Sequence, residues 1–146
     1  MNQGMKKTEY NAFLFAHFAL FVVFVWFGSL KLFGLSPANP LVSDLFGRTL
    51  GIILPMSADT FIVCLGLLEV LIGILFVIPR AEKVGMGLLA VHMVTTIMPL
   101  FLLPDMTWSQ AFVPTLEGQY IIKNIVIIAL AATVFADLGK KRRSAL

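Results

Sequence analysis

The chain has 146 residues, of which 59% are hydrophobic and only 13% are charged. Because a soluble domain carries about a quarter charged residues, this composition excludes an ordinary soluble fold and favours a membrane protein. The net charge of +3 does not indicate a nucleic-acid partner, since the basic residues flank long apolar runs, as they do in membrane proteins.

Four apolar runs reach the length of about 20 residues that a helix needs to cross a bilayer. We predict membrane spans at about residues 12–33, 60–78, 84–103 and 119–136. The first run is long, aromatic-rich and without a small-residue cleavage site, so we expect it to be retained as a helix. The spans predict an all-α integral membrane protein, a four-transmembrane-helix bundle formed by one domain over residues 1–146.

The connection between the first two spans has a helical pattern of its own. In NPLVSDLFGRTLGIILP, apolar residues recur at three- and four-residue steps opposite a polar face. We predict an amphipathic interfacial helix over about residues 40–53, in the first outer loop. Asn39 is the expected cap and Pro40 the expected first helical residue. A re-entrant hairpin is the alternative.

Basic residues lie mainly on one side of the predicted bundle. If the four spans alternate in direction, the basic residues before the first span, between the second and third, and after the fourth share one side. The opposite side has Arg48 as its one basic loop residue. By the positive-inside rule, we expect both termini to be cytoplasmic, and the basic tail also favours anionic lipid. The residues on the basic side are Lys6, Lys7, Arg80, Lys83, Lys140, Lys141, Arg142 and Arg143.

Glu69 is the most conspicuous polar residue within a predicted span, about ten residues from either end. Gly66 and Gly73 share its helical face, and small residues at such spacing let a neighbouring helix approach closely. We therefore expect Glu69 to face the bundle interior, where burial favours the neutral acid unless a cation is near. Its role is either an interhelical hydrogen bond or a ligand or proton site.

Two histidines lie inside predicted spans. His92 shares a face with Thr95 and Thr96, and its simplest interpretation is a core histidine bonded to a hydroxyl or to Glu69. A proton-active role is the alternative. His17 lies in the inner half of the first span, a little out of reach of Glu69. Haem or metal ligation by the two histidines lacks a supporting motif, so no metal site is predicted.

The stretch LEGQYIIKNIVIIAL, residues 116–130, opens the fourth span with several polar residues. An unpaired lysine in lipid is costly, and Lys31 and Lys123 share a depth near the outer ends of spans one and four. We expect a polar cluster in which Glu117 pairs with Lys31 or Lys123, beside Tyr120. The cluster either binds a lipid head group or quinone carbonyl, or only fastens the two spans. Snorkelling of both lysines is the cheaper explanation.

Motifs for self-contained catalysis are missing from the sequence. It contains no Ser–His–acid set, glycine-rich phosphate loop or metal-binding spacing, so no catalytic residue is predicted. The single cysteine, Cys64, excludes dithiol–disulfide chemistry within the chain. Whether the protein is part of an enzyme stays open, and a flavin or haem would come from a partner protein.

Two stretches resemble the DoxX-like membrane proteins, with the YkgB/RclC-type branch as the closer match. One is WFGSLKLFGLSPANPLV at 26–42 and the other is TLEGQYIIKNIVI at 115–127. The resemblance covers most of the chain. Asn124 stands where an acid is expected in that branch. The matching residues are Trp26, Gly28 and Lys31 in the first stretch, and Glu117, Gly118, Tyr120 and Lys123 in the second.

The resemblance implies a four-helix bundle in a bacterial inner membrane and a role in redox or reactive-chlorine stress. Relatives in the family include a membrane subunit of thiosulfate:quinone oxidoreductase, a membrane anchor of an oxidative-stress complex and a receptor-assembly chaperone. We therefore expect a quinone- or lipid-binding membrane subunit with a soluble redox partner. The expected ligand contacts are Trp26, Lys31, Glu117, Tyr120 and Lys123.

Two other functions stay open. One is a non-catalytic membrane anchor or assembly factor that uses the same charges for helix packing. The other is a small proton or solute pathway through Glu69 and His92, which four spans without an internal repeat make less favourable unless several copies assemble. The partner and the formation of a homo-oligomer are not determined by the sequence.

Overall fold

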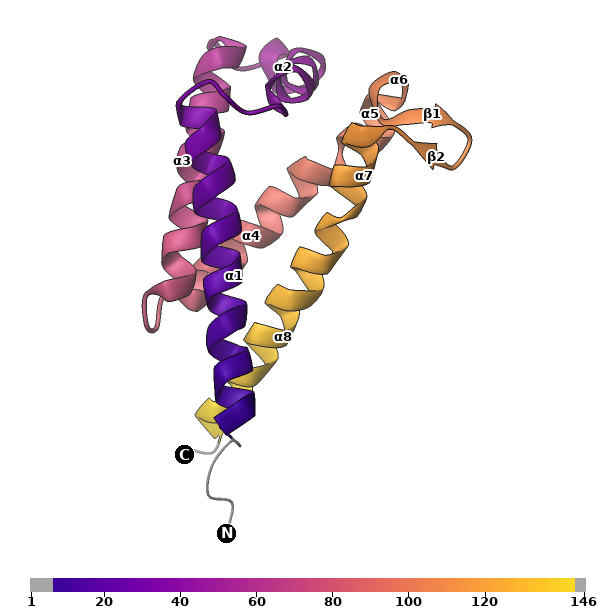
Figure 1. Ribbon diagram of the computed structural model, residues 1–146. Coiled ribbons are helices and arrows are strands. Elements are labelled where there is room, and N and C mark those ends of the chain that lie inside the picture. Colours follow the sequence, from indigo (N-terminus) through magenta and orange to yellow (C-terminus); the bar gives the residue numbers. More distant parts are fainter. Residues whose placement is uncertain (1–6, 144–146) are drawn as a thin grey trace.

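The computed structural model describes the backbone of residues 7–143 and the side chains of residues 9–136. Within these residues, four helices are long and apolar enough to cross a membrane, and they form a helical bundle (Figure 1). The predicted fold class is therefore confirmed. Of the residues predicted on the basic side, Lys6, Lys7 and residues 140–143 lie outside the described side chains. The candidate spans are Glu9–Leu32, Ala58–Val77, Glu82–Leu102 and Leu116–Ala136.

The predicted spans correspond to α1, α3, α4 with α5, and α7 with α8. Proline has no N–H to continue a helical ladder, and α4 gives way to the short α5 at Pro99. A two-stranded hairpin of β1 (Trp108–Gln110) and β2 (Val113–Pro114) was not predicted. The helices are α1 (Lys7–Leu32), α2 (Asn39–Arg48), the 3-10 turn η1 (Leu50–Ile52), α3 (Ala58–Val77), α4 (Glu82–Ile97), α5 (Pro99–Leu102), α6 (Pro104–Thr107), α7 (Leu116–Ile122) and α8 (Asn124–Arg143).

The predicted interfacial helix is α2, which lies beside the upper ends of α1 and α3 (Figure 1). Leu41 and Phe46 are its buried residues, and the Phe46 ring stacks on Phe61 of α3 at 4.8 Å between centroids. α2 ends at Arg48, before the predicted boundary at residue 53, and η1 continues it. This helix replaces the alternative of a re-entrant hairpin.

The predicted cap of α2 is wrong. Ala38 occupies the N-cap position and no side chain caps the helix, and Pro40 is its second residue where the first was expected. Asn39 is already helical, and its Oδ1 is buried without a hydrogen-bond partner. The turn that precedes α2 therefore places Asn39 one position further into the helix than the sequence pattern suggests.

The closest helix contact is between α1 and α3, which run side by side in opposite directions (Figure 1). A Cβ added to Gly28 would lie 2.7 Å from the Gly66 carbonyl oxygen, and one added to Gly66 would lie 2.8 Å from the Gly28 oxygen. Gly73 contacts Val25 and Phe21 of α1 in the same way. The predicted close approach at the glycines beside Glu69 is therefore confirmed.

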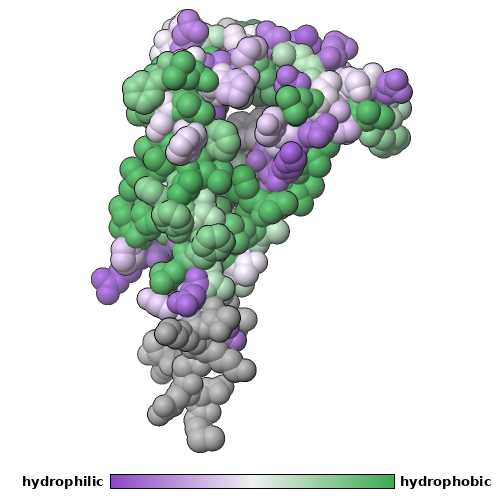
Figure 2. Space-filling model, viewed as in Figure 1, coloured by the Kyte–Doolittle hydropathy of each residue, from purple (hydrophilic) through white to green (hydrophobic). Residues whose placement is uncertain are grey.

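Apolar side chains cover the middle of the molecule. On the face drawn in Figure 2, hydrophobic side chains form a green belt across the middle, and hydrophilic side chains gather at the end that holds α2 and α6. We call this end the α2 end, and the opposite end, where α1 begins and α8 finishes, the terminal end. Such a belt between polar ends is typical of a membrane-spanning protein.

We predict that Gly28→Ala lowers the melting temperature of the detergent-purified protein by several degrees. The new methyl group meets a backbone oxygen that cannot move aside, and overpacking of this kind costs about 1–3 kcal/mol. Gly87→Ala is the matched control, because a Cβ at Gly87 of α4 meets nothing within 4 Å. Equal melting temperatures for the two variants would contradict the close α1–α3 contact.

Candidate functional site

A buried ion pair joins α1 to α3. The Lys31 Nζ lies 2.7 Å from Glu69 Oε2 and 3.0 Å from Glu69 Oε1, so it donates to both carboxylate oxygens. Both residues are only 6% exposed. Lys31 therefore does not snorkel, and the buried Glu69 carboxylate has an oppositely charged partner beside it.

The antiparallel packing of α1 and α3 directs the two side chains toward each other. Lys31 is one turn beyond Gly28, toward the α2 end, whereas Glu69 is one turn beyond Gly66, toward the terminal end. The Cα atoms of Lys31 and Glu69 are therefore separated along the helix axes by about six residues, which is about 9 Å at 1.5 Å per residue. Helical side chains lean toward the N-terminus of their own helix, so Lys31 leans inward and Glu69 leans toward it.

His92 of α4 is the third member of this site. Its Nε2 lies 3.2 Å from Glu69 Oε1 and 3.4 Å from the Thr96 hydroxyl, which itself donates to the His92 carbonyl oxygen. A carboxylate only accepts hydrogen bonds, so this network assigns the proton of the imidazole to Nε2. We call Lys31, Glu69 and His92 the buried triad. With a neutral histidine, the charges of the other two members cancel.

Two imidazole nitrogens in the bundle are buried without a partner. They are His92 Nδ1 and His17 Nε2. His17 is held by a contact of Nδ1 with the Phe13 carbonyl oxygen at 2.9 Å, and its ring lies edge-on to Phe76. His17 makes no contact with the buried triad, as the sequence indicated. Among the described residues, no group of three or more His, Cys, Asp or Glu side chains is placed to hold a metal ion.

The expected pairing of Glu117 is wrong for Lys31, which pairs with Glu69 instead. Within the described part of the chain, Glu117 forms no ion pair with Lys123 either; the Lys123 ammonium lies over the Tyr120 ring, 5.1 Å from its centroid. Glu117, Tyr120 and Lys123 are all exposed. α7 therefore presents these side chains outward, and the predicted outer cluster is divided between two places.

A signal for the missed pairing is present in the sequence. Gly28 precedes Lys31 by three residues, and Gly66 precedes Glu69 by three residues. Small residues mark the face of a membrane helix that meets its neighbour, so each charge shares a face with a contact glycine. Two opposite charges on matched faces indicate a direct pair between the helices.

A shallow hollow of about 550 Å³, open to the surface, lies at the α2 end between the end of α1, the start of α2 and the first turns of α3. We call it the α2-end cavity. Lys31 lines it, so one member of the buried triad reaches it directly. The other polar lining residues are Asn39, Ser43 and Asp59, none of which was predicted as a site residue.

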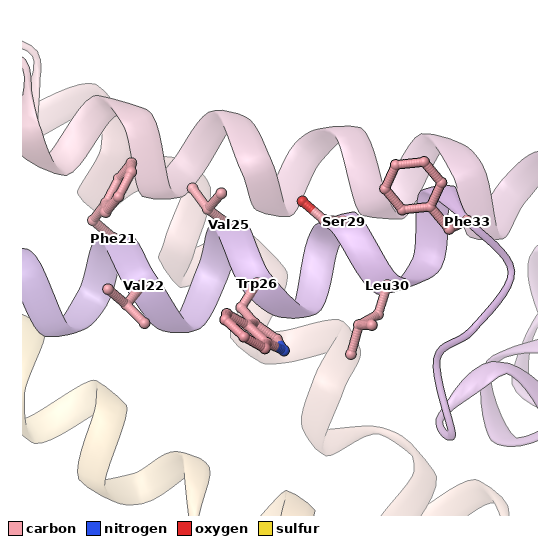
Figure 3. A pocket seen from close by; sticks show the side chains of 7 residues that line it. All are labelled: Phe21, Val22, Val25, Trp26, Ser29, Leu30 and Phe33. Atoms are coloured by element: carbon pink, nitrogen blue, oxygen red, sulfur yellow. The ribbon is translucent and has the colours of Figure 1, made fainter.

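A second, apolar hollow of about 330 Å³ runs along the exposed side of α1, and we call it the α1 groove. In Figure 3 its side chains form two rows, with Phe21, Val25, Ser29 and Phe33 in one and Val22, Trp26 and Leu30 in the other. Trp26 is 65% exposed, so the predicted ligand contact at this residue lies on the groove and away from the buried triad.

Comparisons with known proteins identify no relative. No family model, no curated protein and no solved structure matches the chain.

We predict that Lys31→Met destabilises the protein, because it leaves the Glu69 carboxylate buried without its cation. Breaking a buried pair costs about 3–5 kcal/mol. The double variant Lys31→Met/Glu69→Gln, which buries no charge here, should recover most of that loss. Thermal unfolding followed by tryptophan fluorescence measures both effects, and Lys123→Met, at an exposed position, is the control. A double variant as unstable as Lys31→Met alone would show that the lysine stabilises through something other than Glu69.

Proposed function

We propose that the protein is a membrane subunit that binds a quinone or a similar lipid, with the polar head of the ligand in the α2-end cavity. The single observation that carries the proposal is the position of Lys31, which lines the cavity and is fixed by Glu69. A charged residue held within the membrane is costly. Binding of a ligand would explain why a lysine is present at this depth despite its energetic cost.

The chemistry of Lys31 suits a carbonyl or hydroxyl acceptor. An ammonium group has three N–H donors, and the two oxygens of Glu69 take two of them. On this proposal the third N–H would be donated to the polar head of the ligand. Asn39 and Ser43 add an amide and a hydroxyl to the cavity wall, so a small polar head would find both donors and acceptors.

The resemblance to DoxX-like proteins supports the choice of a quinone and a role in redox or reactive-chlorine stress. On this proposal the protein lies in a bacterial inner membrane with both termini in the cytoplasm, so that the α2-end cavity opens toward the outer leaflet. The uneven distribution of basic residues supports that orientation. The electron donor would be a soluble redox partner.

We expect native mass spectrometry of the detergent-purified protein, followed by solvent extraction, to detect one bound quinone or neutral lipid per chain. The Lys31→Met/Glu69→Gln variant should lose this ligand, because it removes the ammonium donor without leaving a buried charge. Ser43→Leu should also lose it by filling the cavity, and it leaves the ion pair untouched. Lys123→Met, outside the cavity, should retain the ligand.

A tailless dimethoxy-methylbenzoquinone provides the second measurement. It should raise the melting temperature of the wild-type protein and of Lys123→Met, and have no effect on the two cavity variants. A wild-type protein that carries no extracted lipid and is not stabilised by the benzoquinone would rule out the binding function. The buried charges would then be explained either by a non-catalytic anchor or assembly factor or by the proton pathway considered next.

The contact between His92 and Glu69 supports a second candidate function, a proton pathway through the bundle. A carboxylate bonded to an imidazole can pass a proton along that hydrogen bond. If this function operates, proton flux into liposomes, followed with a trapped pH-sensitive dye, should disappear in Glu69→Gln. Glu117→Gln, at an exposed carboxylate, should leave the flux unchanged. Equal flux in liposomes with and without the protein would exclude the pathway.

A further inference from the structure

We infer that the ligand of the α2-end cavity is a single-tailed lipid with an uncharged head, and that its tail lies in the α1 groove. This inference rests on the proposed function and specifies the class of ligand. It joins two hollows that the sequence did not indicate, and it gives Trp26 a role separate from that of Lys31.

The charges around the cavity favour a neutral head. The ammonium of Lys31 is already balanced by Glu69, and Asp59 is the other ionisable residue among those that line the cavity. The cavity therefore has no surplus positive charge to offer a phosphate group, and Asp59 would repel one. An uncharged head with a carbonyl or hydroxyl avoids this repulsion and can form hydrogen bonds with the polar groups of Asn39 and Ser43.

The dimensions of the α1 groove suit one hydrocarbon tail. It extends from Phe21 to Phe33, which is about 18 Å at 1.5 Å per helical residue. Half of a bilayer core is about 15 Å, so the groove follows α1 through roughly one leaflet. The side chains that form its two rows are apolar except for Ser29, and the small side chain of Ser29 deepens the groove (Figure 3).

Phe33 connects the two hollows, since it lines both of them. It is the first residue after α1, and its side chain is 76% exposed. A ligand whose head group lies in the cavity would therefore extend its tail past Phe33 into the groove. The shared residue makes the groove continuous with a polar hollow, which gives a tail in the groove a polar site for its head group.

The test compares two ligands with the same benzoquinone head, one tailless and one with a decyl tail, on purified full-length protein in one detergent. Trp26→Ala removes a wall of the groove far from the cavity. It should weaken binding of the decyl ligand by about tenfold, or 1.4 kcal/mol, and leave binding of the tailless ligand unchanged. Val126→Ala, which truncates an exposed apolar residue of α8, is the matched control and should change neither. Because both variants are measured in the same micelles, partitioning of the ligand into detergent cancels.

The outcomes separate this inference from the proposed function. If Trp26→Ala binds both ligands as the wild type does, the tail does not occupy the groove, and the cavity remains a head-group site. If phosphatidylglycerol displaces the decyl ligand at equal concentration, the preference for a neutral head is wrong. If neither benzoquinone binds the wild-type protein, the proposed function fails and this inference fails with it.

Discussion

Two opposite charges in an apolar interior, Lys31 on α1 and Glu69 on α3, form the contact on which the other features of the site depend. Each charge loses its hydration on burial, and their attraction offsets that loss only when the geometry is close. The mutual contact of Gly28 and Gly66 provides this geometry by bringing the two backbones together. The ion pair and the α1–α3 packing are therefore one structural unit.

The pair also explains why a polar cavity can exist beside a membrane-spanning helix. The ion pair with Glu69 holds the Lys31 side chain inward, away from the head-group region. His92 of α4 contacts the same carboxylate. The charges of Lys31 and Glu69 balance each other, so the cavity above them has no surplus positive charge, and Asp59 adds a negative charge to its wall. This is why we propose an uncharged head group for the ligand.

The four spans are packed unequally. α1 and α3 are in close contact, whereas α8 leans away from them toward the α2 end (Figure 1) and exposes apolar residues such as Ile125 and Val126. In lipid, exposed apolar side chains carry no penalty, because the surrounding chains are equally apolar. The feature that singles out the face of α1 is its hollow shape and its continuity with a polar cavity through Phe33.

The sequence by itself determined the number of spans, the helix between the first two and the inward face of Glu69, because hydropathy, proline positions and glycine spacing act locally. It did not determine the partner of Lys31, which was expected to be Glu117 and is Glu69. That choice depends on the rotation and axial offset of α1 against α3, which only their packing sets. The cavity likewise arises between residues of α1, α2 and α3 that are distant in sequence, so only the tertiary structure brought them together.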